Sequence, residues 1–216
     1  MRKHFDESLN LLNQTIIEMA ELVAEAIRNS VRALRDKDID LAQSVVEGDR
    51  KINAKEKEIE SLAINILLRE QPVASDLRFV TSALKLITDL ERIGDQASDI
   101  AFLNIKLSKR SYEAEDLGSV IQMAKLTITM VEDAIKAHIE GDSDLAVDVV
   151  NRDELVNELF AQARREVIDD FRNQSFETKN TLDIFMIAKY LERIGDHTEN
   201  IGRRVYYSLK GEHLKD

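Results

Sequence analysis

The hexapeptide Leu90-Glu91-Arg92-Ile93-Gly94-Asp95 occurs twice in the chain, returning unchanged as Leu191-Glu192-Arg193-Ile194-Gly195-Asp196. The two copies are about 100 residues apart, and an internal repeat of this length indicates a duplicated structural unit. A second pair of segments, residues 40–53 and 144–157, shares Asp-Leu-Ala, Val-Val, Asp and Asn at the same relative places. The sequence therefore predicts two similar halves.

The composition favours long helices. Of 216 residues, 44% are hydrophobic and 33% charged, which is typical of a soluble globular protein. Only one proline, Pro72, and seven glycines interrupt the chain. The chain has no cysteine, which excludes disulfides, thiolate metal sites and cysteine nucleophiles.

Hydrophobic residues recur at three- and four-residue steps through most of the chain, which is the pattern of a helix with one buried face. The pattern predicts helices at residues 8–35, 41–70, 75–108, 117–140, 145–171 and 181–210. We therefore predict an all-α fold of two tandem three-helix bundles related by a pseudo-twofold repeat. The first domain is expected at residues 1–110 and the second at residues 111–216.

Charge and hydropathy restrict the location and the partners. The net charge of −11 argues against nucleic-acid binding, which needs a basic surface. The N-terminal residues lack the apolar region of a secretory signal, and no apolar run approaches the roughly 18–20 residues of a membrane span. A cytoplasmic protein is expected.

The acidic residues of the hexapeptide are predicted to lie on one face of their helix. Residues four apart are separated by about 40° around a helix axis, so Glu91, Asp95 and Asp99 form one stripe. This stripe lies well away from the apolar one and is expected to face outward. Gly94 falls at the edge of the apolar stripe, and a glycine inside a helix costs about 1 kcal/mol relative to alanine. We expect both hexapeptide glycines to allow close approach of a neighbouring helix.

The second helix of each half carries a matching polar stripe. If the second and third helices are antiparallel neighbours, Asp49 and Asn53 face Glu91 and Asp95. Four oxygen-bearing side chains from two helices suit a hard cation. In the second half the corresponding set is Asp153, Asn157, Glu192 and Asp196. The alternative interpretation is a solvated face in which lysine and arginine residues screen the acids.

The histidines and the known catalytic motifs give little support to an enzyme. His197 follows Asp196, but the first copy has Gln96 in that place; His4, His138 and His213 are expected at the surface. No phosphate-binding glycine loop, Gly-x-Ser-x-Gly or His-Glu-x-x-His motif is present. Di-iron bundles use Glu-x-x-His pairs, and no glutamate here is followed by histidine at that spacing.

Four stretches together carry a resemblance to a known family. They are Glu47-Gly48-Asp49-x-x-Ile52-Asn53, Gln71-Pro72-x-Ala74-x-Asp76-Leu77-Arg78 and the two hexapeptides. Together they resemble the PhoU family over essentially the whole chain. The resemblance implies two three-helix bundles and a regulatory, non-enzymatic role beside the bacterial phosphate-specific ABC transporter. It also implies contact with the transporter ATPase and with a sensor histidine kinase, so that the phosphate-starvation regulon is held off.

The resemblance implies metal sites as well. Family members bind metal clusters through pairs of acidic motifs, which correspond here to Glu91, Asp95, Glu192 and Asp196, opposite the helix-two residues named above. Asp99 extends the first set and is matched by Asn200, so the second site is expected to be weaker. Divalent or trivalent ions (Fe, Mn, Mg or Zn), in a mononuclear or multinuclear site, are implied. The protein would reach the membrane only through its partners, and long helices with outward sites favour a homodimer.

Two other functions stay open at this level. A structural scaffold of the spectrin type would explain the repeat but not the identical acids, and a carboxylate-bridged dimetal hydrolase or oxidase would require turnover. The Gln71–Arg78 stretch has no second copy, with Lys179 roughly where Arg78 stands. The first half is therefore expected to be specialised for a partner.

Overall fold

The protein is all-α. The computed structural model describes residues 2–109, 118–173 and 178–215, and these form six helices without a strand. In chain order the helices are α1 (Arg2–Asp36), α2 (Ile39–Glu70), α3 (Ser75–Leu107), α4 (Gly118–Glu140), α5 (Ser143–Asn173) and α6 (Thr178–Lys210). The predicted fold class is confirmed. The periodicity located α2 to α6 to within three residues, whereas α1 begins six residues before the predicted start at residue 8.

The helices end where the local chemistry requires. Asp38 caps α2 by accepting a hydrogen bond from the Leu41 backbone N–H at 2.9 Å, and Asp142 does the same for Leu145 before α5. Gln71 closes α2 in the left-handed conformation, immediately before the proline that cannot continue the helix. These short connections keep successive helices antiparallel.

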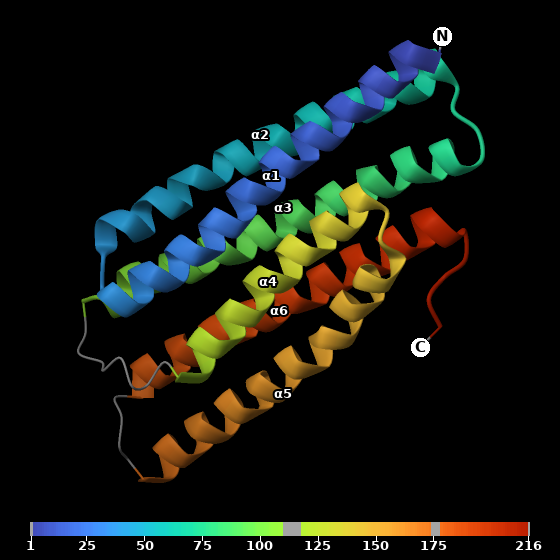
Figure 1. Cartoon of the computed structure of the whole chain (residues 1–216). Coiled ribbons are helices and arrows are strands. Elements are labelled where there is room, and N and C mark those ends of the chain that lie inside the picture. The colour runs from blue at the N-terminus through green and yellow to red at the C-terminus, as the bar shows by residue number, and fades with distance from the viewer. Residues whose placement is uncertain (1, 110–117, 174–177, 216) are drawn as a thin grey trace.

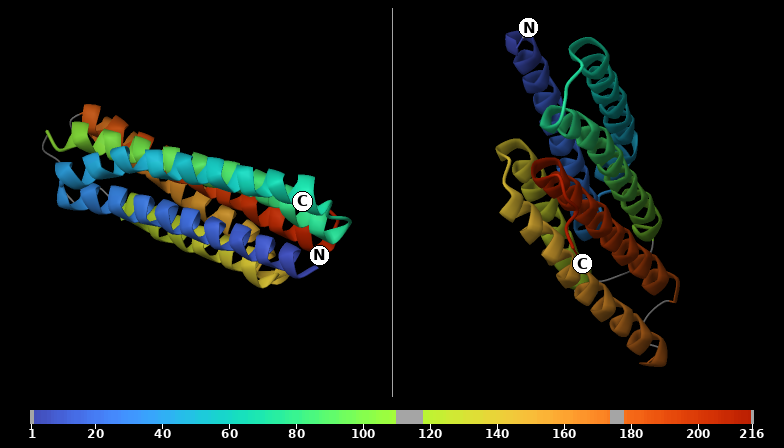
Figure 2. Two further views of the ribbon diagram at one scale, coloured as in Figure 1. Left: turned by 90° about the horizontal axis from the view of Figure 1, so that it is seen from above. Right: turned by 90° about the vertical axis from the view of Figure 1, so that its right-hand side faces the viewer.

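The six helices run along one long axis (Figures 1 and 2). The first three helices pack together and the last three do likewise, while α3 and α6 lie against each other at the centre of the molecule. The helices that carry the two hexapeptides are therefore direct neighbours. The predicted domain boundary at residues 110 and 111 lies outside the described residues. No described helix is both long enough and apolar enough to cross a membrane.

The hydrophobic core runs through both halves as one continuous cluster. Leu90 and Ile93 are completely buried in it, and so are Leu191 and Ile194. Burial of this kind contributes about 1.5–3 kcal/mol for each large apolar side chain. The apolar positions of the hexapeptide therefore form part of this core in both halves.

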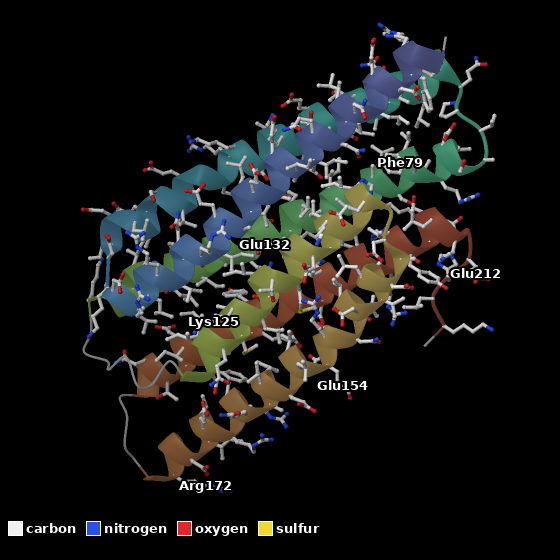
Figure 3. The ribbon with its side chains drawn as sticks, in the orientation of Figure 1. Phe79, Lys125, Glu132, Glu154, Arg172 and Glu212 are labelled. Carbon is white, nitrogen blue, oxygen red and sulfur yellow. The ribbon has the colours of Figure 1, made fainter. Side chains whose placement is uncertain are left out.

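A buried ion pair crosses the contact between α3 and α6. Asp89 is 2% exposed, and its carboxylate accepts a hydrogen bond from Arg204 Nε at 2.8 Å. The other carboxylate oxygen lies 3.1 Å from His197 Nδ1. On another face of the molecule, Arg28 of α1 pairs with Glu132 of α4 at 2.7 Å (Figure 3). Polar contacts thus join the halves at the centre and at the surface.

Candidate functional site

The first acidic cluster lies between α2 and α3. Asp49 is half-buried on α2, and burial raises the pKa of its carboxyl; the charges of Asp95 and Asp99 on α3 raise it further. The hydrogen bond from Asn53 acts in the opposite direction. The two helices therefore face each other with their acidic sides, as the spacing predicted.

The amide of Asn53 fixes the Asp49 carboxylate and leaves acceptors unused. Asn53 Nδ2 donates to Asp49 Oδ2 at 3.0 Å. Asp49 Oδ1 and Asn53 Oδ1 are buried and have no hydrogen-bond partner among the described residues. Buried oxygens without a donor are costly, so these two atoms are suited to a ligand that supplies positive charge.

Glu91 of α3 faces acids on both helices of this cluster. Burial raises the pKa of Glu91, and so do the charges of Asp95, Glu56 and Asp49, while Arg92 lowers it. Glu56, on the same face of α2 as Asp49 and Asn53, is thus close to the cluster, although it was not among the predicted ligands.

Asp99 extends the cluster toward the second half. Burial raises the pKa of its carboxyl first, and then the charge of Asp95 raises it further. Arg193 of α6 lowers it, so the end of the cluster lies beside the second hexapeptide.

The second acidic cluster lies between α5 and α6 and is more deeply buried. Asp153 is 7% exposed, and the pKa of its carboxyl is raised to about 6. Burial is the largest cause, and the charges of Asp196, Glu199 and Glu192 raise it further. Asn157 Nδ2 donates to Asp153 Oδ2 at 2.9 Å, and Asp153 Oδ1 is buried without a partner. The arrangement of the first cluster is therefore repeated.

Two details differ from the sequence prediction, and one adds to it. Asp153, which was predicted to face Glu192 and Asp196 between the two helices, is buried at the seam of α5 with α6. Asn200, the expected partner at the position of Asp99, is exposed. Glu199, one residue earlier, contributes the charge on that turn of α6, raising the pKa of both Asp153 and Asp196.

The two hexapeptide glycines meet different neighbours. A Cβ on Gly94 would lie 2.9 Å from Ile52 Cδ1, so this glycine lets α2 and α3 approach closely, as predicted. A Cβ on Gly195 would lie 2.7 Å from Asp153 Oδ1 and 3.1 Å from Val156 Cγ1. In the second half the glycine therefore also makes room for the Asp153 carboxylate, which was predicted only to face α6.

The side chains as arranged do not form a closed metal cage. No three His, Cys, Asp or Glu groups within the described ranges converge as coordination of one ion requires. The donor set nevertheless fits a cation. Each cluster combines several carboxylates with an unpartnered buried oxygen. The pKa values of Asp49 and Asp153 are raised rather than lowered, which means that positive charge is scarce there.

A lysine makes the two clusters unequal. Lys189 Nζ contacts Glu192 Oε2 at 2.5 Å and also lies over the Phe160 ring. It lowers the pKa of Asp196, against burial and the charge of Glu192, which raise it. The position equivalent to Lys189 in the first half is Thr88, so the first cluster has no lysine at that place.

Known proteins are similar to this chain in sequence and in fold. The PhoU domain model matches residues 16–103 and 120–205. The phosphate-specific transport system accessory protein PhoU homolog 1 of Thermotoga maritima is 34% identical over 213 residues, covering 99% of this chain and 92% of that protein. The corresponding homolog of Pseudomonas aeruginosa is 36% identical over 219 residues, covering 99% and 88%.

Solved structures give the same result. PhoU from Pseudomonas aeruginosa superposes with a TM-score of 0.92 at 35% identity, covering 96% of this chain and all of that one. The phosphate transport system regulatory protein PhoU from Streptococcus pneumoniae superposes with a TM-score of 0.89 at 30% identity, covering 98% and 99%. With two domain matches, near-complete coverage and the same six-helix fold, the chain belongs to the PhoU family.

Proposed function

We propose that the protein is a regulatory accessory protein of a phosphate-specific transport system, and that its two acidic clusters bind metal ions. The relatives named for that transport system support the first part. One observation carries the second part: equivalent pairs of helices hold equivalent acids, and in each pair a buried aspartate oxygen has no hydrogen-bond partner.

The ligands of the proposed sites are all oxygens. In the first cluster Asp49, Asn53, Glu91, Asp95 and Asp99 would hold the ion, and in the second Asp153, Asn157, Glu192, Asp196 and Glu199. Carboxylate and carbonyl oxygens favour Mg²⁺, Mn²⁺ and iron over Zn²⁺, which prefers nitrogen and sulfur. When bound, such an ion supplies the positive charge that the clusters lack.

Cation binding would also act on the helices. The ligands of one cluster come from two helices, so the side chains must rotate toward each other and the bound ion would link α2 to α3, or α5 to α6. Binding must also displace a proton from Asp153, because the raised pKa of its carboxyl favours the protonated form. We therefore expect occupancy to stabilise the bundles. Because Lys189 already neutralises part of the second cluster, the first is proposed to bind more tightly.

Calorimetric titration of chelator-treated protein with Mn²⁺ tests the metal assignment. The Asp49→Asn/Asp95→Asn variant should lose the tighter site and the Asp153→Asn/Asp196→Asn variant the weaker one, each with at least about tenfold lower affinity, because each change removes two ionised ligands. A variant of matched charge, Glu154→Gln/Glu158→Gln, alters exposed acids of α5 and should bind as the unmodified protein does. Equal affinity in all variants would refute the assignment.

For the regulatory role, we propose that the protein acts between the transporter ATPase and a sensor histidine kinase, as a negative regulator of the phosphate-starvation response. Three apolar side chains flank the α2–α3 connection and are exposed: Leu68 at 71%, Val73 at 72% and Leu77 at 42%. Exposed apolar groups at one connection suit a partner surface. The first half was predicted to be specialised for a partner, and we assign the contact to this stretch. Self-association into a homodimer stays a prediction.

Deletion of the coding sequence tests the regulatory role. Expression of phosphate-scavenging genes should become constitutive in phosphate-rich medium, because the signal of sufficiency no longer reaches the kinase. Repression should return with the unmodified chain and fail to return with a Val73→Asp/Leu77→Asp variant of normal stability. Unchanged repression in the deletion strain would argue strongly against the role.

A further inference from the structure

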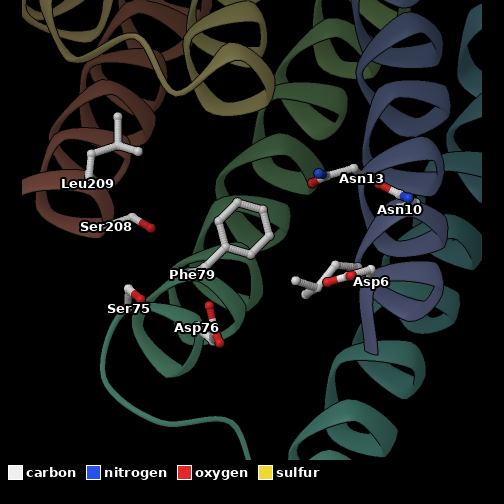
Figure 4. Close-up of a pocket in the computed structure, with 9 residues that line it drawn as sticks. Asp6, Asn10, Asn13, Ser75, Asp76, Phe79, Ser208 and Leu209 are labelled. Carbon is white, nitrogen blue, oxygen red and sulfur yellow. The ribbon is translucent and has the colours of Figure 1, made fainter. Parts of the chain in front are cut away.

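A cavity of about 470 Å³ lies at one end of the molecule, between α1 and α3 of the first half and α6 of the second (Figure 4). It is separate from both acidic clusters and shares no residue with them. Its lining consists of Asp6, Leu9, Asn10, Asn13, Ser75, Asp76, Phe79, Ser208 and Leu209. The volume falls within the range of sites for small molecules, about 300–1,000 Å³.

The wall of this cavity contains a buried hydroxyl without a partner. Ser208 is 6% exposed, and its Oγ makes no hydrogen bond to any other described residue. Figure 4 shows its oxygen on the side of the Phe79 ring, with Asn13 approaching from the opposite side. Asn13 Oδ1 is also buried and without a partner. Two unused acceptors therefore line the same space from α6 and α1.

The charges that line the cavity are negative. Asp6 and Asp76 stand at its exposed rim, and neither carboxylate makes an ion pair or hydrogen bond with another side chain of the described residues. None of the described side chains that line the cavity is a lysine, arginine or histidine. The lining therefore offers acceptors and negative charge to a ligand.

The aromatic ring adds an apolar surface without adding charge. Phe79 stacks on His138, with ring centroids 4.8 Å apart. His138 was expected at the surface but is 3% exposed, and burial lowers the pKa of its imidazole to about 4, so it is neutral at pH 7. An aromatic ring attracts cations to its face.

The unrepeated stretch from Gln71 to Arg78 builds one side of the cavity. Ser75 and Asp76 belong to its lining, and the Arg78 side chain packs 3.4 Å from the position of a Cβ on Gly211. Arg78 Nε lies 3.5 Å from the Ser208 carbonyl oxygen. Arg78 thus joins α3 to the end of α6. This contact gives a structural role to the stretch that has no counterpart in the second half.

We propose that this cavity binds a small organic cation with a guanidinium or primary ammonium group. Such a group has several N–H donors for the unpartnered oxygens of Ser208 and Asn13, and positive charge for Asp6 and Asp76. Its carbon chain fits against Phe79, Leu9 and Leu209, which a hydrated metal ion would not use. The same chemistry is carried by free amines and by arginine or lysine side chains of another protein.

Calorimetric titration of the full chain with agmatine, in chelator and at low salt, tests the proposal. Binding should be saturable with one site per chain. The Asp6→Asn/Asp76→Asn variant should bind at least about tenfold more weakly, because two charge-assisted hydrogen bonds are lost. A parallel titration with a capped Gly-Arg-Gly peptide separates the two sources: tighter binding of the peptide indicates a partner side chain, and tighter binding of agmatine a free amine.

Two further variants make the result decisive. Ser208→Ala removes an unpartnered buried hydroxyl, so the free protein should be at least as stable as before while agmatine binding weakens severalfold. Glu154→Gln/Glu158→Gln, which changes the net charge by the same amount elsewhere, should leave agmatine binding unchanged. The proposal is wrong if agmatine and the peptide do not bind, if Ser208→Ala has no effect, or if the charge-matched variant weakens binding equally.

Discussion

Replacing Arg204 with methionine should lower the free energy of unfolding by about 3 kcal/mol, because it leaves the carboxylate of Asp89 buried between α3 and α6 without its strongest partner. Methionine retains most of the apolar stem of arginine, so the loss reports on charge and not on packing. His197 alone then faces Asp89, at 3.1 Å. Urea unfolding at pH 7.5, followed by circular dichroism, measures the change.

Two controls separate this effect from the general cost of losing an arginine. Arg165→Met removes an exposed arginine of α5 and should change the unfolding free energy by less than about 0.5 kcal/mol. The Asp89→Asn/Arg204→Met double variant should recover a large part of the loss, because it no longer buries an unpaired charge. A cost for Arg204→Met no larger than that for Arg165→Met would show that the ion pair contributes nothing.

As the pH rises from 4 to 7, the contribution of Asp153 to the stability of the metal-free protein should fall by up to about 3 kcal/mol, while buried His138, whose pKa is lowered, acts in the opposite direction. The folded state raises the pKa of this carboxyl from an ordinary 3.8 to about 6. Protonation therefore favours folding; the stabilisation is complete below about pH 3.8 and lost as the pH passes 6. Each pKa unit corresponds to about 1.4 kcal/mol. Raised pKa values at Asp49 and Asp196 add in the same direction.

Asp153→Asn tests this assignment, because asparagine resembles the protonated acid at every pH. In chelator, the variant should be close to the unmodified protein at pH 4 and more stable by up to about 3 kcal/mol at pH 7. Glu154→Gln, which changes an exposed acid beside it (Figure 3), should follow the unmodified curve. Parallel curves for Asp153→Asn and the unmodified protein would exclude a raised pKa at this residue.

The helices could be predicted because their determinants are local. Apolar spacing, the acids before α2 and α5, and Pro72 after α2 each act within a few residues, and the structure agrees with each. The facing of Asp49 and Asp95 could also be predicted, since two repeats of the same spacing limit which helix faces meet. Hydrogen bonds from Asn53 and Asn157 to the adjacent aspartates follow from their four-residue separation.

Contacts between distant segments could not be predicted in this way. Asp89 stands directly before the first hexapeptide, whereas Tyr190 stands directly before the second. This difference was the one sign of the ion pair in the sequence, but a single acid does not reveal its partners. Glu199 was missed because the repeat pointed to Asn200, and only the rotation of α6 in the structure distinguishes them. The cavity combines residues from both ends of the chain with the start of α3, so no local pattern indicates it.

The pairing of α3 with α6 also has a consequence for synthesis of the chain. The carboxylate of Asp89 finds its arginine 115 residues later in the sequence. As the chain emerges from the ribosome, the first three helices can form while the inner face of α3 still lacks its cover, and that face is closed only when the last helix arrives. Contacts so distant in sequence form late and slowly. The nascent first half is therefore the stage at which this protein most needs protection from aggregation.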